Sequence, residues 1–183
     1  RKSRILANQA WVKCGSRVEY FWHSDAYFSF NPNKATLMYS KESPFIGGET
    51  HFINMRLAYQ SLSLQMKELI EHKKISYKNA YLNRPPVVHP LVRVNTVTKE
   101  KALFINAHKA INIEGIDEAT SRGIIDSLYD HAIKTDLIYK HKWQDGDILV
   151  WDNPSTMHTA TPIEDTAVRK LYRILIAGNL PVS

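Results

Sequence analysis

The sequence predicts a mainly β fold with flanking helices, an α+β domain built as a β-sandwich or jelly roll with helical support. Short apolar stretches of strand character lie along the chain, and three of them, DILVWD (147–152), MHTATPI (157–163) and KLYRILIAG (170–178), lie near its C-terminal end. Only two regions have helical spacing. Because neither an internal repeat nor a linker divides the 183 residues, we expect one domain over residues 1–183.

The earlier β elements follow from local patterns. KATLMYS (34–40) and KALFIN (101–106) are typical of short strands, and the aromatic run WHSDAYF (22–28) resembles a third. SPFIGGET (43–50) predicts a turn with two glycines. NRPPVVHP (83–90) is rich in proline, which has no N–H for a sheet, so we expect a loop there.

The two helical regions have recognisable starts. Residues 54–73 are typical of one or two helices, with Ser63 as the N-cap of the second. Residues 115–134 predict another helix, with Asp117 as its N-cap. The apolar face expected on this helix consists of Ile124, Ile125, Leu128 and Ala132.

Composition narrows the class of protein. Hydrophobic residues make up 44% and charged residues 23%, as in ordinary globular domains, and no apolar run approaches the length of a membrane span. We expect a cytoplasmic location, because no signal peptide opens the sequence and Cys14 is the single cysteine. The net charge of +6 fits an anionic small-molecule partner or merely a solvated basic surface. The lysines are dispersed and predict no nucleic-acid binding.

His23 and Asp25 stand two residues apart within WHSDAYF. Residues i and i+2 of a strand point to the same face, so we expect this imidazole and carboxylate to approach one spot. Burying such a pair is costly unless something binds it, and a divalent metal is one answer. The pattern is short, and by itself it also fits a surface pair on an edge strand.

A third candidate ligand and two arginines follow much later in the chain. His158, in TMHTA, would complete a 2-His-1-carboxylate set, which occupies one face of an iron octahedron and leaves three positions open. Arg169 and Arg173 are four residues apart on a predicted strand, so we expect both guanidinium groups in one cavity. The planar fork of arginine suits carboxylates, which predicts a dicarboxylate, or an anionic substrate beside it.

Six motifs, WHSDAYF, GGETHF, HPLVR, W…GDILVWDN, TMHTA and R…YRILIAG, occur across residues 20–179. Together they resemble the taurine dioxygenase and 2,4-dichlorophenoxyacetate dioxygenase (TauD/TfdA) family, whose members are Fe(II)- and 2-oxoglutarate-dependent oxygenases on a cupin-like double-stranded β-helix. The resemblance implies Fe(II), 2-oxoglutarate and O2, with release of succinate and CO2. It also implies oxidation, most often hydroxylation, of a C–H bond in a small substrate that carries a carboxylate or sulfonate.

The same resemblance assigns roles to single residues. Thr50 matches the threonine whose hydroxyl meets a carboxylate of 2-oxoglutarate, and Arg169 matches the arginine that pairs with its distal carboxylate. Arg173 matches the residue that holds the anionic group of the substrate or, in some relatives, the cosubstrate. Trp151 matches an aromatic residue near the iron and the substrate. The iron ligands implied, which are also the catalytic residues, are His23, Asp25 and His158.

The chain also departs from the family pattern. Members usually carry a further segment before WHSD and an active-site lid between the positions of EHKK and RPPVVHP, and such lids close over substrate. We therefore expect most substrate-contacting residues to lie in segments that this sequence lacks. Two competing functions stay open: a protein that binds metal or ligand without turnover, and an oxygenase that acts on nucleic acid. A non-hydroxylating oxidation and assembly as a homo-oligomer stay open as well.

Overall fold

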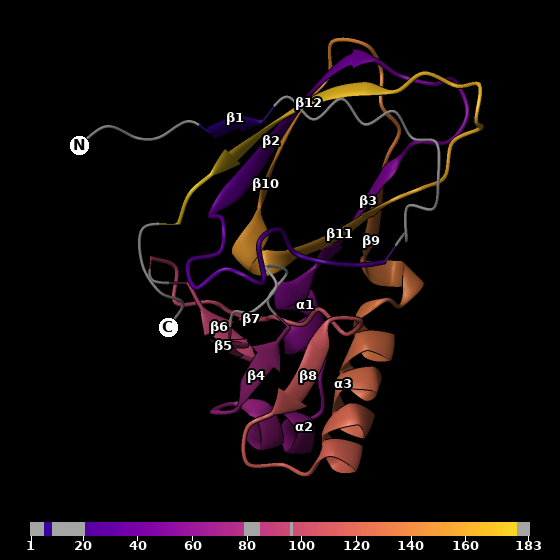
Figure 1. Cartoon of the computed structure of the whole chain (residues 1–183). Coiled ribbons are helices and arrows are strands. Elements are labelled where there is room, and N and C mark those ends of the chain that lie inside the picture. The colour runs from indigo at the N-terminus through magenta and orange to yellow at the C-terminus, as the bar shows by residue number, and fades with distance from the viewer. Residues whose placement is uncertain (1–5, 9–20, 79–84, 96, 179–183) are drawn as a thin grey trace.

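The computed structural model describes residues 6–8, 21–78, 85–95 and 97–178, and Cys14 lies outside them. These residues form a mainly β structure with few helices. Figure 1 shows two sheets in the upper half of the molecule and a mixed helical and β segment below them. No helix among the described residues is both long and apolar enough to cross a membrane.

The first sheet is antiparallel and contains the C-terminal strand and three others. Its strands, in spatial order, are β1 (Leu6–Asn8), β12 (Lys170–Ile176), β2 (Ala35–Glu42) and β10 (Ile148–Asp152). The predictions of strands in KATLMYS, DILVWD and KLYRILIAG are therefore confirmed. Thr36 and Ser40 of β2 are fully buried, which places polar side chains on the inner face of this sheet.

The second sheet is also antiparallel and supplies most of the candidate site. Its strands, in spatial order, are β11 (Thr156–Ala160), β3 (Thr50–Asn54) and β9 (Ile138–His141). A backbone bridge between His23 and His158 adds the chain around His23 beside β11. The strand prediction for WHSDAYF is wrong apart from this bridge, because residues 25–28 form a turn. In this turn the Asp25 carboxylate accepts a hydrogen bond from Thr36.

The long segment between β3 and β9 folds as a layer beneath the two sheets (Figure 1). Its strands β5, β4 and β8 pair in that order, and β6 pairs with β7. The helices of this layer are α1 (Met55–Gln60), α2 (Leu64–Ile70), α3 (Glu118–Ala132) and the 3-10 helix η1 (Thr135–Leu137). Its strands are β4 (Lys74–Tyr77), β5 (Val87–Pro90), β6 (Val92–Val94), β7 (Lys101–Leu103) and β8 (Ala110–Ile113).

Helix starts agree with the sequence prediction because they depend on local contacts. The Ser63 hydroxyl accepts a hydrogen bond from the Met66 N–H at 3.2 Å, as an N-cap does. The Asp117 carboxylate accepts one from the Thr120 N–H at 3.0 Å and begins α3. Ile124 is partly buried, and the fully buried apolar residues of the predicted α3 face are Ile125, Leu128 and Ala132.

The loop predicted for NRPPVVHP is wrong over Val87–Pro90, which forms strand β5. β5 lies at the edge of its sheet and pairs only with β4, so the missing N–H of Pro90 leaves no ladder bond unmade on its outer side. Residues 79–84, which precede this strand, lie outside the described residues.

The hydrophobic core lies mainly in the lower layer and at its junction with β3 and β11. Ile53 of β3 and Met157 of β11 are fully buried together with residues of α2, β4 and α3. The outer face of β10 is open by contrast, with Ile148 and Val150 exposed. The lower layer therefore anchors the two strands that carry Thr50 and His158.

Candidate metal centre and cosubstrate site

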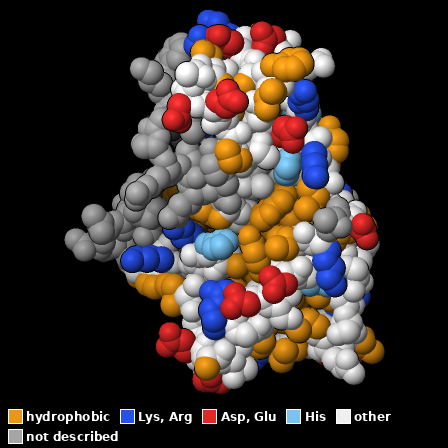
Figure 2. Space-filling view, turned by 90° about the vertical axis from the view of Figure 1, so that its right-hand side faces the viewer, with side chains coloured by type: hydrophobic (Ala, Val, Ile, Leu, Met, Phe, Trp, Pro, Cys, Tyr) orange, Lys and Arg blue, Asp and Glu red, His pale blue; other side chains and the backbone are white. Residues whose placement is uncertain are grey.

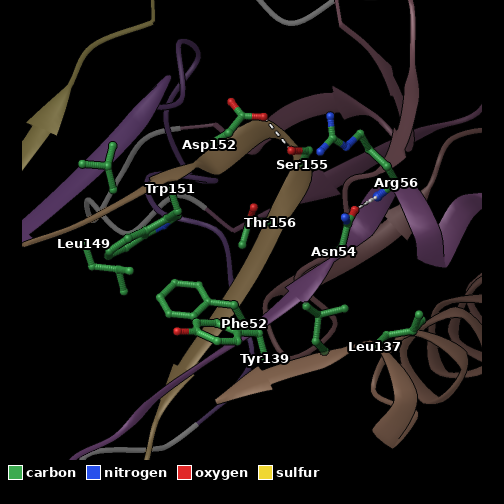
Figure 3. A pocket seen from close by; sticks show the side chains of 12 residues that line it. Phe52, Asn54, Arg56, Leu137, Tyr139, Leu149, Trp151, Asp152, Ser155 and Thr156 are labelled. Carbon is green, nitrogen blue, oxygen red and sulfur yellow. Dashed lines mark hydrogen bonds between the residues drawn. The ribbon is translucent and has the colours of Figure 1, made fainter. Parts of the chain in front are cut away.

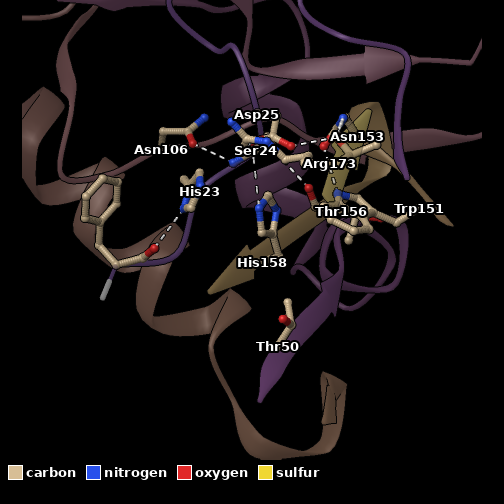
Figure 4. Close-up of polar contacts among 12 residues, drawn as sticks. His23, Ser24, Asp25, Thr50, Asn106, Trp151, Asn153, Thr156, His158 and Arg173 are labelled. Carbon is tan, nitrogen blue, oxygen red and sulfur yellow. Dashed lines mark hydrogen bonds and ion pairs between the residues drawn. The ribbon is translucent and has the colours of Figure 1, made fainter. Parts of the chain in front are cut away.

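His23, Asp25 and His158 lie together where the segment that contains His23 runs beside β11 (Figure 4). One ligand atom from each lies within 4.8 Å of the other two, and His158 Nε2 is 3.9 Å from Asp25 Oδ1. Paired backbone bonds between His23 and His158, 3.0 and 2.8 Å long, fix the two histidines side by side. The structure therefore brings together the three residues that the sequence predicted as ligands.

The free nitrogens of these histidines fit a metal ion. Nδ1 of His23 lies 3.0 Å from the Phe21 carbonyl oxygen and donates to it, which leaves the Nε2 lone pair for a ligand bond. His158 is buried, its Nδ1 has no hydrogen-bond partner among the described residues, and its Nε2 is too far from Asp25 for a hydrogen bond. A buried imidazole without hydrogen bonds is unusual unless another ligand engages it.

The electrostatics of the cluster favour the protonation states that a metal requires. Burial lowers the pKa of His158 to about 3, with a further contribution from His23, so this imidazole is neutral. Burial opposes ionisation of Asp25, but His158, the Thr36 hydroxyl and Arg173 outweigh it and hold the Asp25 pKa below its usual value. A neutral imidazole and an ionised carboxylate are the forms that bind divalent metals.

Thr50 lies at the start of β3 with its side chain buried, and its oxygen is contacted by two donors. The Trp143 indole N–H donates to Thr50 Oγ1 at 2.9 Å, and Arg169 Nη2 approaches it at 3.4 Å. Arg169 also donates from Nε to the Gly48 carbonyl at 3.0 Å. Because neither donor can accept, the Thr50 hydroxyl proton can be donated to an anion.

Trp143 is a residue for which the sequence analysis proposed no role. It is the first residue of the motif W…GDILVWDN, so the motif pointed to Trp143 itself. The motif did not indicate which residue the indole contacts. The partner of its indole, Thr50, lies far away in the sequence, and only the fold shows that they meet.

Arg169 and Arg173 contact different residues of the candidate site. β12 begins at Lys170, after Arg169, and its register with β2 shifts between Lys170 and Leu171. Arg169 thus lies one residue before β12 and Arg173 within it, and the shared cavity for their guanidinium groups stays a prediction. Arg169 contacts Thr50, whereas Arg173 Nη1 lies 3.4 Å from Asp25 Oδ1.

Aromatic rings enclose His158. The Trp151 ring centroid is 4.9 Å and the Phe52 centroid 6.0 Å from that of the imidazole. These two aromatic residues also line a cavity of about 360 Å³ beside β3, β9 and β10 (Figure 3). His158 does not line this cavity, so Phe52 and Trp151 separate the cavity from the metal cluster.

Ser24, between the two N-terminal ligands, anchors them to the rest of the fold. Its backbone N–H donates to Asn106 Oδ1 at 2.8 Å, and its hydroxyl donates to the Thr156 carbonyl at 2.8 Å (Figure 4). One bond leads to the lower layer and the other to β11. Ser24 and Asn106 were not identified from the sequence, since neither could itself bind a metal there.

Comparison with known proteins agrees with this geometry. The profile of the taurine catabolism dioxygenase TauD, TfdA family matches residues 7–175. The alpha-ketoglutarate-dependent 2,4-dichlorophenoxyacetate dioxygenase of Cupriavidus pinatubonensis is 32% identical over 185 residues, which cover 93% of this chain and 64% of that protein. The alpha-ketoglutarate-dependent sulfate ester dioxygenase of Pseudomonas putida is 30% identical over 183 residues, covering 88% of this chain and 60% of that protein.

Solved structures are similar as well. AAD-2 in complex with Mn(II) and N-oxalylglycine superimposes with a TM-score of 0.82 at 29% identity, covering 89% of this chain and 70% of that one. A taurine dioxygenase from Burkholderia xenovorans gives a TM-score of 0.79 at 30% identity, covering 87% and 57%. The chain spans less than two thirds of the length of the first curated relatives that it matches. On the profile match, the chain belongs to the taurine catabolism dioxygenase TauD, TfdA family.

Proposed function

We propose that this chain forms the centre of an Fe(II)- and 2-oxoglutarate-dependent dioxygenase that oxidises a C–H bond of a small anionic substrate. The observation that carries the proposal is the cluster of His23, Asp25 and His158, whose ligand atoms lie within 4.8 Å of one another. Two imidazoles and one carboxylate suit Fe(II) and leave open positions for other ligands. The names of the relatives support the same cosubstrate, since they are described as alpha-ketoglutarate-dependent.

The proposed cosubstrate contacts are Thr50 and Arg169. Thr50 can donate its hydroxyl proton while Trp143 and Arg169 occupy its oxygen, and Arg169 adds a positive charge beside it. A carboxylate placed there would accept from both side chains. N-oxalylglycine, which AAD-2 binds together with Mn(II), carries two terminal carboxylates as 2-oxoglutarate does, so the similarity in fold supports this assignment.

In the proposed reaction the protein holds, orients and shields the reactants. His23 and His158 would bind the metal through neutral nitrogens, and Asp25 would neutralise part of its charge. Fe(II), when bound, supplies the redox chemistry that couples O2 to the decarboxylation of 2-oxoglutarate. One O2, one 2-oxoglutarate and one substrate C–H give one alcohol, one succinate and one CO2. Phe52 and Trp151 cover one side of the His158 ring and exclude water from it.

We propose a carboxylate or sulfonate on the substrate because Arg173 faces the metal cluster. Its side chain is 36% exposed, and its Nη1 lies 3.4 Å from Asp25 Oδ1, so an anion at the open side would meet its charge. The relatives named for 2,4-dichlorophenoxyacetate, phenoxypropionate and sulfate esters support this substrate class. If the oxidised carbon lies beside a heteroatom, hydroxylation would also cleave the substrate.

We further infer that the two sheets form a double-stranded β-helix within one domain. The strand orders of the two sheets are β1-β12-β2-β10 and β11-β3-β9. The His23 bridge to β11 occupies the place of a fourth strand in the second sheet. Two facing antiparallel sheets of this kind are the jelly-roll arrangement.

The experiment is to measure succinate formation with Fe(II), 2-oxoglutarate and a panel of phenoxyacetic, phenoxypropionic, sulfonic and sulfate-ester compounds. We expect at least one anionic compound to stimulate succinate release, and His158→Ala to abolish it. His72→Ala, at an exposed histidine, is the matched control and should behave as the unaltered chain. A chain that binds Fe(II) and 2-oxoglutarate but releases no succinate with any compound would favour the non-catalytic alternative.

A further inference from the structure

A chain of hydrogen bonds ends on the Asp25 carboxylate at the oxygen farther from His158. We infer that Asn153 and Thr36 are positioning residues for the metal: together they fix Asp25 as a ligand through one oxygen, Oδ1. This inference rests on the proposed metal centre. It concerns the buried groups behind the cluster, which neither contact substrate nor bind the metal themselves.

The hydrogen-bond chain consists of three short, buried hydrogen bonds. Trp151 Nε1 lies 2.9 Å from Asn153 Oδ1, Asn153 Nδ2 lies 2.7 Å from Thr36 Oγ1, and Thr36 Oγ1 lies 2.6 Å from Asp25 Oδ2. The exposed fractions are 7% for Trp151, 1% for Asn153, 0% for Thr36 and 6% for Asp25. Figure 4 shows Asn153 and Trp151 beside Asp25, on the side away from His23. Water therefore has little access to these bonds.

The direction of every bond in the chain is determined by its first member. An indole N–H can only donate, so the oxygen of the Asn153 amide must face Trp151 and its NH2 must face Thr36. The Thr36 oxygen then accepts from Asn153, and its own proton is directed to the carboxylate, which only accepts when ionised. All donors point toward Asp25, and bonds aligned in this way strengthen one another.

The backbone holds this chain rigidly. Trp151 and Thr36 are directly opposite partners on the paired strands β10 and β2. Asn153 begins the 3-10 helix η2 (Asn153–Ser155) immediately after β10, and its N–H donates to the Lys34 carbonyl at 3.1 Å. Two of the donors therefore lie on paired strands, and Asn153 is held immediately beyond them, so the side chains keep a fixed geometry.

The two carboxylate oxygens consequently have different surroundings. Oδ2 receives the Thr36 proton, whereas Oδ1 lies 3.9 Å from His158 Nε2 and 3.4 Å from Arg173 Nη1. Oδ1 is therefore the oxygen that lies near the His158 nitrogen. Trp151 links both sides of the cluster, because its ring packs on His158 while its N–H starts the chain to Asp25. A purely structural role for these bonds would affect the stability of the fold but not the metal.

The test is calorimetric titration of the metal-free full chain with Mn(II), without 2-oxoglutarate or turnover. Thr36→Val keeps the shape of the side chain but removes its proton, and we expect an affinity about 10- to 100-fold lower, as for other residues that orient a ligand. Thr36→Ser restores the hydroxyl and should bind within about threefold of the unaltered chain. Asn153→Ala should weaken binding in the same direction, and the double variant should bind no more weakly than Thr36→Val alone.

Two controls separate this effect from a general loss of structure. Thr159, beside His158, has a buried hydroxyl without a hydrogen-bond partner in the described part of the chain, so Thr159→Val should leave the Mn(II) affinity unchanged. The visible d–d spectrum of the Co(II)-loaded chain reports ligand number and geometry. It should change in Thr36→Val, because the freed Oδ2 can also approach the metal, and should be recovered in Thr36→Ser.

The outcomes distinguish this inference from the proposed function. If Thr36→Val and Asn153→Ala bind Mn(II) as the unaltered chain does, with the same Co(II) spectrum, the positioning role is wrong. The metal centre itself would still stand if His158→Ala lost the metal. Additive effects of Thr36→Val and Asn153→Ala on the Mn(II) affinity would also contradict the inference that both residues act through one hydrogen-bond chain. If the unaltered chain bound no Mn(II), or His158→Ala bound it equally well, both proposals would fall.

Discussion

Thr36 and Thr50 are buried threonines whose oxygens already accept hydrogen bonds from N–H donors. Each hydroxyl proton can therefore be donated only to another acceptor. Thr36 donates to Asp25, and Thr50 is left to donate to an anion. Resemblance to the family identified Thr50, but Thr36 could not be chosen from the sequence. A threonine in a strand is common, and its importance here comes from contacts with residues far away in the chain.

Replacing Thr50 tests the hydroxyl directly. Thr50→Val removes the proton proposed to reach the 2-oxoglutarate carboxylate, and a hydrogen bond to a charged group contributes about 1.5–3 kcal/mol. We expect the dissociation constant for 2-oxoglutarate to rise about 10- to 100-fold with metal affinity unchanged, measured by anaerobic titration of the metal-loaded chain. Thr50→Ser is the control and should bind nearly normally. Equal affinity in Thr50→Val and Thr50→Ser would exclude the contact.

His89 provides a pH-dependent test of burial. Burial, with help from Arg93, lowers its pKa to about 4, and its Nε2 lies 2.9 Å from the Tyr27 carbonyl oxygen. The folded chain keeps His89 neutral, whereas the unfolded chain binds a proton below about pH 6.5. The stabilisation from neutral His89 is therefore complete above pH 6.5 and is lost as the pH falls toward 4. At pH 5 the loss amounts to about 2 kcal/mol.

His89→Gln isolates that contribution, because its amide can still donate to the Tyr27 carbonyl but does not titrate. The free energy of unfolding of the metal-free chain, measured in urea, should fall between pH 7.5 and pH 5. The fall should be about 2 kcal/mol smaller in this variant than in the unaltered chain. Parallel losses in the two proteins would show that His89 is not buried in its neutral form.

Among the elements, those fixed by neighbouring residues could be predicted from sequence and those fixed by distant contacts could not. The caps Ser63 and Asp117 define α2 and α3 because their partners lie three residues away. β5 could be recognised only from its pairing with β4, which leaves Pro90 on an edge strand, where a proline is compatible with a sheet. The WHSDAYF segment forms a single bridge followed by a turn, and its Asp25 accepts a hydrogen bond from Thr36, which is distant in the sequence.

The turn between β2 and β3 should be highly sensitive to added volume. Gly47 has a φ of 75°, and a Cβ there would lie 2.3 Å from the Pro162 carbonyl oxygen. Gly47→Ala should lower the free energy of unfolding by about 3 kcal/mol, from the left-handed backbone and the clash together. Gly146→Ala is the control, because its φ is 93° but nothing lies within 4 Å.

For Gly146→Ala we expect only the backbone cost of about 1–2 kcal/mol. Both values come from urea unfolding curves with equal slopes. If the two substitutions cost the same, the close approach of Gly47 to Pro162 does not constrain this turn.

For the whole molecule, the candidate ligands connect distant parts of the chain, because His23 and Asp25 precede the first central strand and His158 belongs to β11. The sequence could predict the β class and these ligands, since the motifs keep their order. It could also predict the helices and β7 of the lower layer, but not β4, β6 and β8, which are short and depend on packing. Substrate contacts other than those proposed for Arg173 and Trp151 stay unpredicted, because this chain spans less than two thirds of the length of the first curated relatives.

Metal binding should therefore stabilise the whole fold. At a free Mn(II) concentration 100 times the dissociation constant, the free energy of unfolding should rise by about 2.7 kcal/mol, and EDTA should reverse the gain. Chemical denaturation with and without Mn(II) measures it. In His158→Ala the gain should disappear, whereas His72→Ala should keep it. Equal stabilisation of His158→Ala would place the metal elsewhere.

The most direct measurement is the visible spectrum of the full chain mixed anaerobically with Fe(II) and 2-oxoglutarate. A 2-oxo acid chelated to Fe(II) has a weak metal-to-ligand charge-transfer band, and we expect this band in the unaltered chain and in His72→Ala. It should be absent in His158→Ala, and Arg169→Ala should need far more 2-oxoglutarate to develop it. An unaltered chain that binds Fe(II) but shows no band at saturating 2-oxoglutarate would contradict the central claim.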